Sequence, residues 1–185
     1  MSNSKNIDIA KNVIDIESKA VAAIADKLGK SFEDAVSSIL DCSGRLIILG
    51  MGKSGLISQK IAATMSSTGT PSHFVHPADA FHGDLGMITK DDVVLMISNS
   101  GETNELLQII PALKKKKIPT IGMFGKENST LFNSVDHALD TSVEKEACPL
   151  DLTPTASTTA TLAMGDALAV ALLENRGFDA QDFAE

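Results

Sequence analysis

The sequence predicts an α/β protein, with mostly parallel strands in a doubly wound sheet covered by helices on both faces. Short apolar runs without alternation, such as residues 93–97, are typical of strands buried on both faces of a parallel sheet. These runs alternate along the chain with segments of helical periodicity. No repeat or linker divides the sequence, so we expect residues 1–185 to form one domain that includes N-terminal helices over about 6–43.

The first forty residues predict two helices. Apolar residues recur at helical spacing over about 6–28, which predicts a long amphipathic helix. Ser31 with Asp34 predicts a capped start for a second helix, which runs through Leu40.

Two short strands then flank a third helix. The apolar run 45–49 predicts a buried strand, and a glycine-containing turn leads into a helix over about 56–67. Residues 72–75 predict a second strand, and we expect a loop over 77–86.

The rest of the chain continues the alternation. The predicted order is strand 93–97, helix 103–116, strand 120–124, short helix 129–135, strand 137–142 and helix 155–175. The basic run Lys114–Lys117 suits the C-terminal dipole of its helix, and Gly177 fits the position just beyond the last one.

Composition excludes several classes of function. The net charge of −8 and the lack of Trp and Tyr argue against nucleic acid as a partner. The polar N-terminus is unlike a secretory signal, and no apolar run looks long enough to cross a bilayer. Cys42 and Cys148 are far apart in sequence, which argues against a thiolate metal site. We therefore expect a cytoplasmic protein with no membrane contact, metal or cofactor.

The turn that follows strand 93–97 is the most informative segment. Residues 98–105 read Ser-Asn-Ser-Gly-Glu-Thr-Asn-Glu, where a strand ends and a helix begins. Backbone amides, three short hydroxyls and a helix N-terminus suit a phosphate dianion, and ordinary helix capping would need only one hydroxyl. Glu102 and Glu105 are either first-turn residues that suit the dipole or carboxylates that act on a phosphorylated substrate.

A second loop, Gly50–Gly55, matches the G-x-G-x-x-G pattern of dinucleotide sites. The second strand ends without the acidic residue that would hold a ribose, and Ile47 stands where a Walker A motif needs glycine. A glycine turn explains the glycines but not the polar Lys53 and Ser54 at a strand end. Lys53 could neutralise a phosphate or stabilise an oxyanion.

A third loop, residues 144–159, carries further candidates. Apolar neighbours flank Glu146, which predicts partial desolvation and a raised pKa, although a solvated charge cluster is the alternative. Thr155 and Ser157 open the last long helix, where they could meet ligand groups. Cys148 is interpreted as a small buried apolar residue, because no base stands beside it.

The loop 77–86 holds His82, which Gly83 follows directly. A histidine in such a loop near a strand end could transfer protons. His76, His82 and Asp84 could also form a weak metal site, although nothing in the sequence fixes their geometry.

These motifs together resemble the sugar isomerase (SIS) domain family. Ser98–Thr103 resembles the family signature, and the similarity to its D-arabinose 5-phosphate isomerase branch runs from about residue 10 to Phe183. The motifs similar to that branch are Gly50–Gly55, Ser67–Pro71, His82–Gly86, Lys145–Pro149 and Ser157–Ala169.

The resemblance implies a five-stranded parallel αβα sandwich and, usually, a homotetramer. It also implies interconversion of D-ribulose 5-phosphate and D-arabinose 5-phosphate, which supplies 3-deoxy-D-manno-octulosonate for lipopolysaccharide. The implied catalytic residues are Lys53, His82, Glu105 and Glu146, with His82 serving the site of a neighbouring chain. The sugar phosphate is expected to contact Gly52, Ser54, Ser98, Asn99, Ser100, Gly101, Thr103, Thr155 and Ser157.

Members of the family usually continue with a His-Pro-Gly-Gly segment, whose histidine the resemblance implies to be catalytic, and many then carry a CBS pair. Neither is present in this sequence, so we expect an excised catalytic domain, with a natural short form as the alternative.

An aldose–ketose isomerase moves a proton between C1 and C2 through a cis-enediol, which needs a base and charge stabilisation at the carbonyl oxygen. We expect Glu105 to be the base, Glu146 to move the hydroxyl proton and Lys53 to stabilise the enediolate. Alternatives are a non-catalytic sugar-phosphate sensor, an isomerase for another ketose phosphate, and feedback binding of a nucleotide sugar.

Overall fold

The computed structural model describes residues 2–81 and 83–184. Within them, five strands form one parallel sheet in the order β2-β1-β3-β4-β5. The strands are β1 (Leu46–Gly50), β2 (Ser72–Val75), β3 (Val93–Ser98), β4 (Thr120–Phe124) and β5 (His137–Asp140). The predicted fold class, a doubly wound αβα sandwich with a five-stranded parallel sheet, is confirmed.

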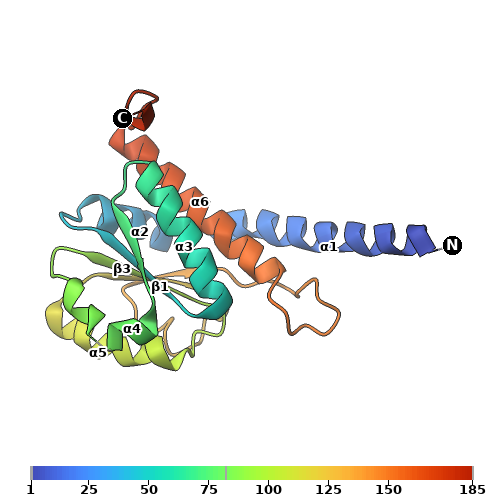
Figure 1. Cartoon of the computed structure of the whole chain (residues 1–185), viewed down its shortest axis with the longest axis horizontal. Coiled ribbons are helices and arrows are strands. Elements are labelled where there is room, and N and C mark those ends of the chain that lie inside the picture. The colour runs from blue at the N-terminus through green and yellow to red at the C-terminus, as the bar shows by residue number, and fades with distance from the viewer. Residues whose placement is uncertain (1, 82, 185) are drawn as a thin grey trace.

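Helices cover both faces of this sheet (Figure 1). On one face lie α1 (Ser2–Ile24), η1 (Ala25–Lys27), α2 (Lys30–Leu40), α3 (Gly52–Ser67) and α6 (Ala156–Arg176). On the other lie α4 (Pro77–Phe81), the 3-10 helix η2 (Asp84–Met87) and α5 (Asn104–Lys116). A last 3-10 helix, η3, spans Asp182–Ala184. The N-terminal half of α1 extends away from the body (Figure 1).

The alternation of side chains along β1 explains the two layers. Leu46 and Ile48 pack with the helices of the α3 and α6 layer, whereas Ile47 and Leu49 pack with the α5 layer. All four are fully or almost fully buried. Because successive strand residues face opposite sides, an uninterrupted apolar run serves both layers at once.

Three predicted helix features were wrong. Ser31 lies inside α2, whose N-cap is Gly29, because the Gly29 carbonyl accepts hydrogen bonds from the amides of Phe32 and Glu33. The expected loop 77–86 contains α4 and η2. The expected short helix 129–135 is a series of turns, since the Leu131 amide donates to the Gly101 carbonyl (3.0 Å) and not within its own segment.

The last long helix, α6, is the central helix of its layer. It is long and apolar enough to cross a bilayer, so the prediction that no run reaches that length was wrong. Five of its buried residues nevertheless belong to the same apolar cluster as Ile61 and Met65 of α3, namely Ala160, Met164, Leu168, Ala169 and Leu172. Gly165 approaches Ile61 so closely that a Cβ would lie 2.4 Å from the isoleucine Cδ1. We interpret α6 as a core helix.

Candidate functional site

The carboxyl ends of β1 and β3 lie side by side at the switch point, where the order in which the chain adds strands to the sheet reverses. From β1 the chain moves to the edge strand β2, and from β3 it moves the other way, to β4. The connections that leave such neighbouring strands diverge and leave a crevice, which is where ligands bind in open parallel sheets. The segments 51–54 and 99–103 meet there.

The turn after β3 is built around the buried Ser98. Its hydroxyl accepts a hydrogen bond from the Gly101 amide (3.0 Å) and lies 2.7 Å from the Thr103 hydroxyl. Gly101 adopts a positive φ of 64°, a conformation that suits glycine. Ser98 therefore shapes the turn, while Asn99 and Ser100 are exposed above it.

The N-terminus of α5 follows this turn. Thr103 is the N-cap residue, and its side chain does not accept a hydrogen bond from the first helical turn. The Ser100 hydroxyl accepts one from the Glu102 amide (3.1 Å). The exposed hydroxyl and the positive end of the helix make the turn suitable for an anion, as the sequence predicts.

Glu102 has a structural contact. Its carboxylate accepts a hydrogen bond from the Thr130 amide (2.7 Å), and the donors of Thr130 lower the pKa of Glu102. Of the two carboxylates beside the turn, this one joins the β3 and β4 loops.

A small cleft of about 30 Å³ brings together polar residues from three predicted loops. Lys53 and Ser54 come from the start of α3, Asn99 from the turn after β3, and Ser157 from the start of α6. Gly52, with φ 54°, begins α3 without a side-chain cap on that helix. The Ser157 hydroxyl is buried without a hydrogen-bond partner among the described residues. Two helix N-termini thus border the cleft.

Glu146 holds the start of α6. Its Oε2 atom accepts hydrogen bonds from the Thr155 amide (2.8 Å), the Thr155 hydroxyl (2.9 Å) and the Ser157 amide (3.2 Å). Burial raises the pKa of Glu146, but the donors of Ser157 and Thr155 outweigh burial, and the pKa is lowered. The predicted raised pKa was wrong, because a helix N-terminus stabilises the charged form.

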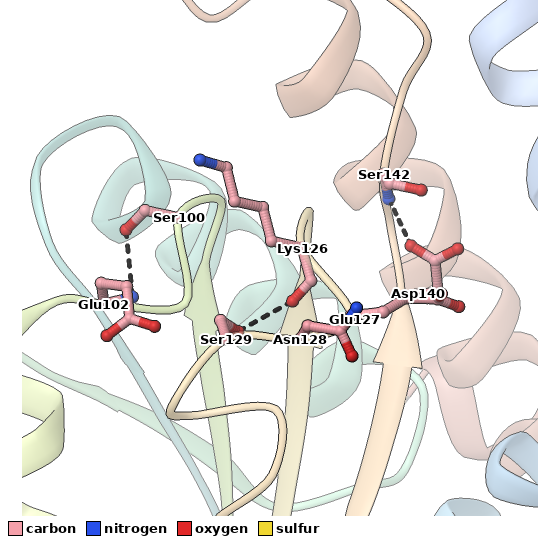
Figure 2. A pocket seen from close by; sticks show the side chains of 8 residues that line it. All are labelled: Ser100, Glu102, Lys126, Glu127, Asn128, Ser129, Asp140 and Ser142. Carbon is pink, nitrogen blue, oxygen red and sulfur yellow. Dashed lines mark hydrogen bonds between the residues drawn. The ribbon is translucent and has the colours of Figure 1, made fainter.

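A wider hollow of about 590 Å³ opens beside the same turn (Figure 2). Ser100 and Glu102 line it together with residues at or just beyond the carboxyl ends of β4 and β5, namely Lys126, Glu127, Asn128, Ser129, Asp140 and Ser142. Sequence reasoning singled out none of these latter six residues. The feature of the sequence that could have revealed them is their place at the carboxyl ends of β4 and β5, where ligands bind in open parallel sheets.

The remaining candidates are the predicted catalytic residues Glu105 and His82 and the weak metal site. Glu105 is half-buried in the first turn of α5 and lines neither the cleft nor the hollow. His82 lies outside the described residues. Within residues 2–81 and 83–184 no group of three His, Cys, Asp or Glu residues could hold a metal ion.

Cys148 differs from its interpretation as a buried apolar residue. It is half-buried, and hydrogen-bond donors of Thr153, Leu150 and Leu152 lower its pKa to about 7. The loop after Glu146 surrounds the thiol with donors, which the sequence pattern did not reveal.

Comparison with known proteins places this geometry in a family. The model of the SIS domain matches residues 39–171. The chain belongs to the SIS domain family. Its five-stranded parallel sheet with helices on both faces is the fold of an SIS domain.

Several relatives are similar over the whole chain. Arabinose 5-phosphate isomerase KdsD of Pseudomonas aeruginosa is 52% identical over 100% of this chain and 57% of its own length. KdsD of Yersinia pestis is 55% identical over 94% of this chain and 53% of its own. The chain thus spans about half the length of these relatives. An E. coli CFT073 protein solved in complex with arabinose 5-phosphate is 43% identical to this chain, with a TM-score of 0.95. The alignment of the two structures covers 100% of this chain and 98% of the E. coli chain.

Proposed function

We propose that this SIS domain interconverts D-ribulose 5-phosphate and D-arabinose 5-phosphate through a cis-enediol intermediate. The observation that carries the proposal is the E. coli neighbour in complex with arabinose 5-phosphate, which matches this chain at nearly full length on both sides. The KdsD relatives bear the name of the same activity. The crevice at the switch point offers the polar groups that such a reaction needs.

The phosphate is proposed to bind on the turn after β3. The Ser100 hydroxyl is exposed there, close to the N-terminus of α5, which begins at Asn104. Ser98 and Thr103 hold the turn in shape through their 2.7 Å contact. Lys53 and Ser54, across the cleft, would meet the same dianion or the sugar next to it.

The proton transfer is assigned to carboxylates. Glu105, two residues beyond Thr103, is half-buried and would act as base towards C1 and C2 of a substrate anchored by its phosphate. Glu146, whose Oε2 atom is held by Thr155 and Ser157, is proposed to move the hydroxyl proton between O1 and O2. Lys53 would stabilise the enediolate oxygen. His82 is proposed to assist opening of the sugar ring from a neighbouring chain.

We further propose a homotetramer that works in the cytoplasm and supplies 3-deoxy-D-manno-octulosonate for lipopolysaccharide. The support for assembly is the exposed apolar side chains on α1, since Ile7, Ile9 and Ile14 are each more than half exposed. A neighbouring subunit would cover them. The support for the location is the phosphorylated substrate and the sparse, free cysteines.

The test is an NMR assay in D₂O with D-ribulose 5-phosphate as substrate. Appearance of D-arabinose 5-phosphate with deuterium at the exchanged carbon is expected, because the base exchanges the proton that it has removed for a deuteron from D₂O and returns that deuteron to the enediol. Unphosphorylated D-ribulose is the control and is expected to react poorly. Glu105→Gln is expected to lower kcat by about 10²–10⁴-fold with little change in binding. Absence of product and of deuterium exchange would overturn the proposal.

A further inference from the structure

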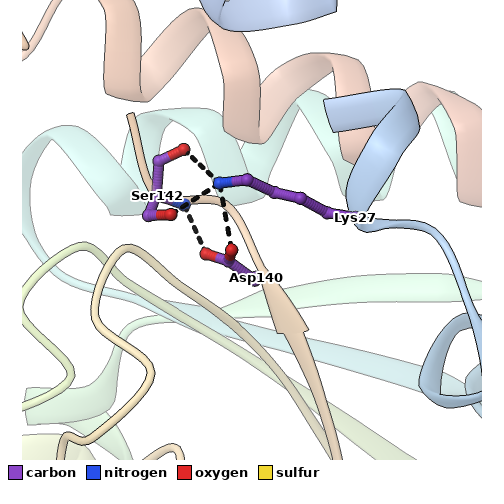
Figure 3. A network of polar contacts seen from close by, with 3 residues as sticks. All are labelled: Lys27, Asp140 and Ser142. Atoms are coloured by element: carbon purple, nitrogen blue, oxygen red, sulfur yellow. Dashed lines mark hydrogen bonds and ion pairs between the residues drawn. The ribbon is translucent and has the colours of Figure 1, made fainter. Parts of the chain in front are cut away.

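Lys27 joins the N-terminal helical segment to the point where β5 leaves the sheet. Its ammonium group contacts the Asp140 carboxylate (3.0 Å) and donates to the Ser142 carbonyl (2.6 Å) and the Ser142 hydroxyl (2.5 Å), as Figure 3 shows. The other Asp140 oxygen accepts a hydrogen bond from the Ser142 amide (2.7 Å). A lysine has three N–H donors, so each has an acceptor here.

This contact differs from an ordinary surface ion pair. The side chains of Lys27 and Asp140 are only 22% and 16% exposed, whereas those of Lys19 and Asp15 in α1 are 75% and 55% exposed. Exposed pairs contribute little, but removal of one partner from a buried pair leaves an uncompensated charge. The Lys27 contact therefore resists rearrangement at the end of β5.

The contact fixes one end of the segment that carries Glu146. Ser142 lies four residues before Glu146, and Glu146 itself is held by Thr155 and Ser157 at the start of α6. Residues 143–145 connect these two anchored points. The location of the Glu146 carboxylate thus depends on both anchors.

A second contact joins α1 to the same loop from its other side. The Glu17 carboxylate accepts a hydrogen bond from the Thr159 hydroxyl (2.9 Å) in the first turn of α6. Glu17 and Lys27 therefore brace the two ends of the loop 142–159, which begins at Ser142 and leads into α6. Asp140 and Ser142 also form one side of the hollow in Figure 2.

We propose that Lys27 is a positioning residue for the isomerisation, which holds the loop 142–146 so that the Glu146 carboxylate stays aligned with the substrate. The inference rests on the proposed function. Lys27 contacts neither cleft nor turn, so it acts through Asp140 and Ser142. Its loss would displace a proton-transfer group and leave the phosphate turn intact.

Lys27→Met, which removes the charge but keeps the length of the side chain, is the test variant. It is expected to lower kcat by about 10- to 100-fold with little change in KM, because small misplacement of a catalytic group is costly. Lys27→Arg is expected to restore most of kcat. Lys19→Met, on the same helical segment and exposed, is the matched control and is expected to behave like the unmodified chain. Unchanged kcat in Lys27→Met would overturn the inference.

Hydrogen exchange provides a readout that does not need activity. Lys27→Met, but not Lys19→Met, is expected to speed exchange of amides 143–147 and to leave amides 98–103 unaffected. If the unmodified chain shows no isomerase activity, the proposed function fails. The positioning of the loop by Lys27 is then tested by exchange alone, and equal exchange rates of amides 143–147 in Lys27→Met and Lys19→Met would reject it. If Lys27→Met does not fold, Ser142→Ala decides: a lowered kcat at unchanged melting temperature supports the inference, and an unchanged kcat rejects it.

Discussion

Substitution of Gly101 by alanine tests how the turn after β3 is built. Gly101 has φ 64°, and a Cβ there would lie 1.9 Å from the Ser129 hydroxyl oxygen. Gly177, at the end of α6, has φ 66° and open space around the position of a Cβ. The two glycines therefore share a backbone conformation but differ in the contact that a methyl group would make.

The expected magnitudes follow from this difference. A left-handed conformation costs an L-residue about 1–2 kcal/mol, which applies to both variants. Gly101→Ala must also displace Ser129, whose hydroxyl donates to the Lys126 carbonyl at 2.8 Å. Overpacking of this kind costs about 1–3 kcal/mol. We expect Gly177→Ala to lose about 1 kcal/mol of unfolding free energy and Gly101→Ala about 3 kcal/mol.

Urea unfolding with linear extrapolation measures both variants. KM should rise in Gly101→Ala alone, since the turn proposed to bind phosphate moves. The double variant Gly101→Ala with Ser129→Gly is expected to recover part of the lost stability, because it removes the obstructing side chain. Equal destabilisation by Gly101→Ala and Gly177→Ala would refute the reasoning.

Three further predictions concern carboxylates and the turn. Asp92 is buried, and although burial raises its pKa, hydrogen bonds from Thr89 and Arg45 outweigh burial and lower it. The stabilisation by Asp92 is thus present above 3.8, its ordinary pKa, and is lost as pH falls through the folded pKa. Asp92→Asn should therefore flatten the acid limb of a profile of unfolding free energy against pH. Glu146→Gln should cost about 1 kcal/mol of unfolding free energy and lower kcat, whereas an exchange of the exposed Glu144 for glutamine should do neither. Ser100→Ala should raise KM with kcat little changed, as steady-state kinetics would show; an unchanged KM would count against the phosphate turn.

The strands were the easiest elements to predict. Residues 120–124 match β4 as predicted, because a strand buried on both faces needs an apolar run and bounded length. The switch-point turn could also be predicted, since Ser98 ends β3 and Ser100 and Gly101 come directly after it. The local sequence encodes these features almost completely.

The remaining features depend on contacts between distant segments. The pKa of Glu146 was predicted in the wrong direction because its donors, Thr155 and Ser157, belong to a helix that starts ten residues later. The hollow of Figure 2 escaped prediction because Lys126 and Asp140 form no motif and become neighbours only through the pairing of β4 with β5. Lys27 belongs to no motif, and its contact with Ser142 joins two residues that are 115 positions apart in sequence.

The central claim is that the substrate phosphate binds on the turn after β3, at the switch point. A ¹H–¹⁵N NMR titration of the ¹⁵N-labelled chain with D-arabinose 5-phosphate tests it most directly. We predict saturable shifts concentrated in the amides of residues 98–103, lost in Ser100→Ala. Shifts concentrated instead in residues 126–129 and 140–142 would place the ligand in the hollow of Figure 2 and contradict the claim.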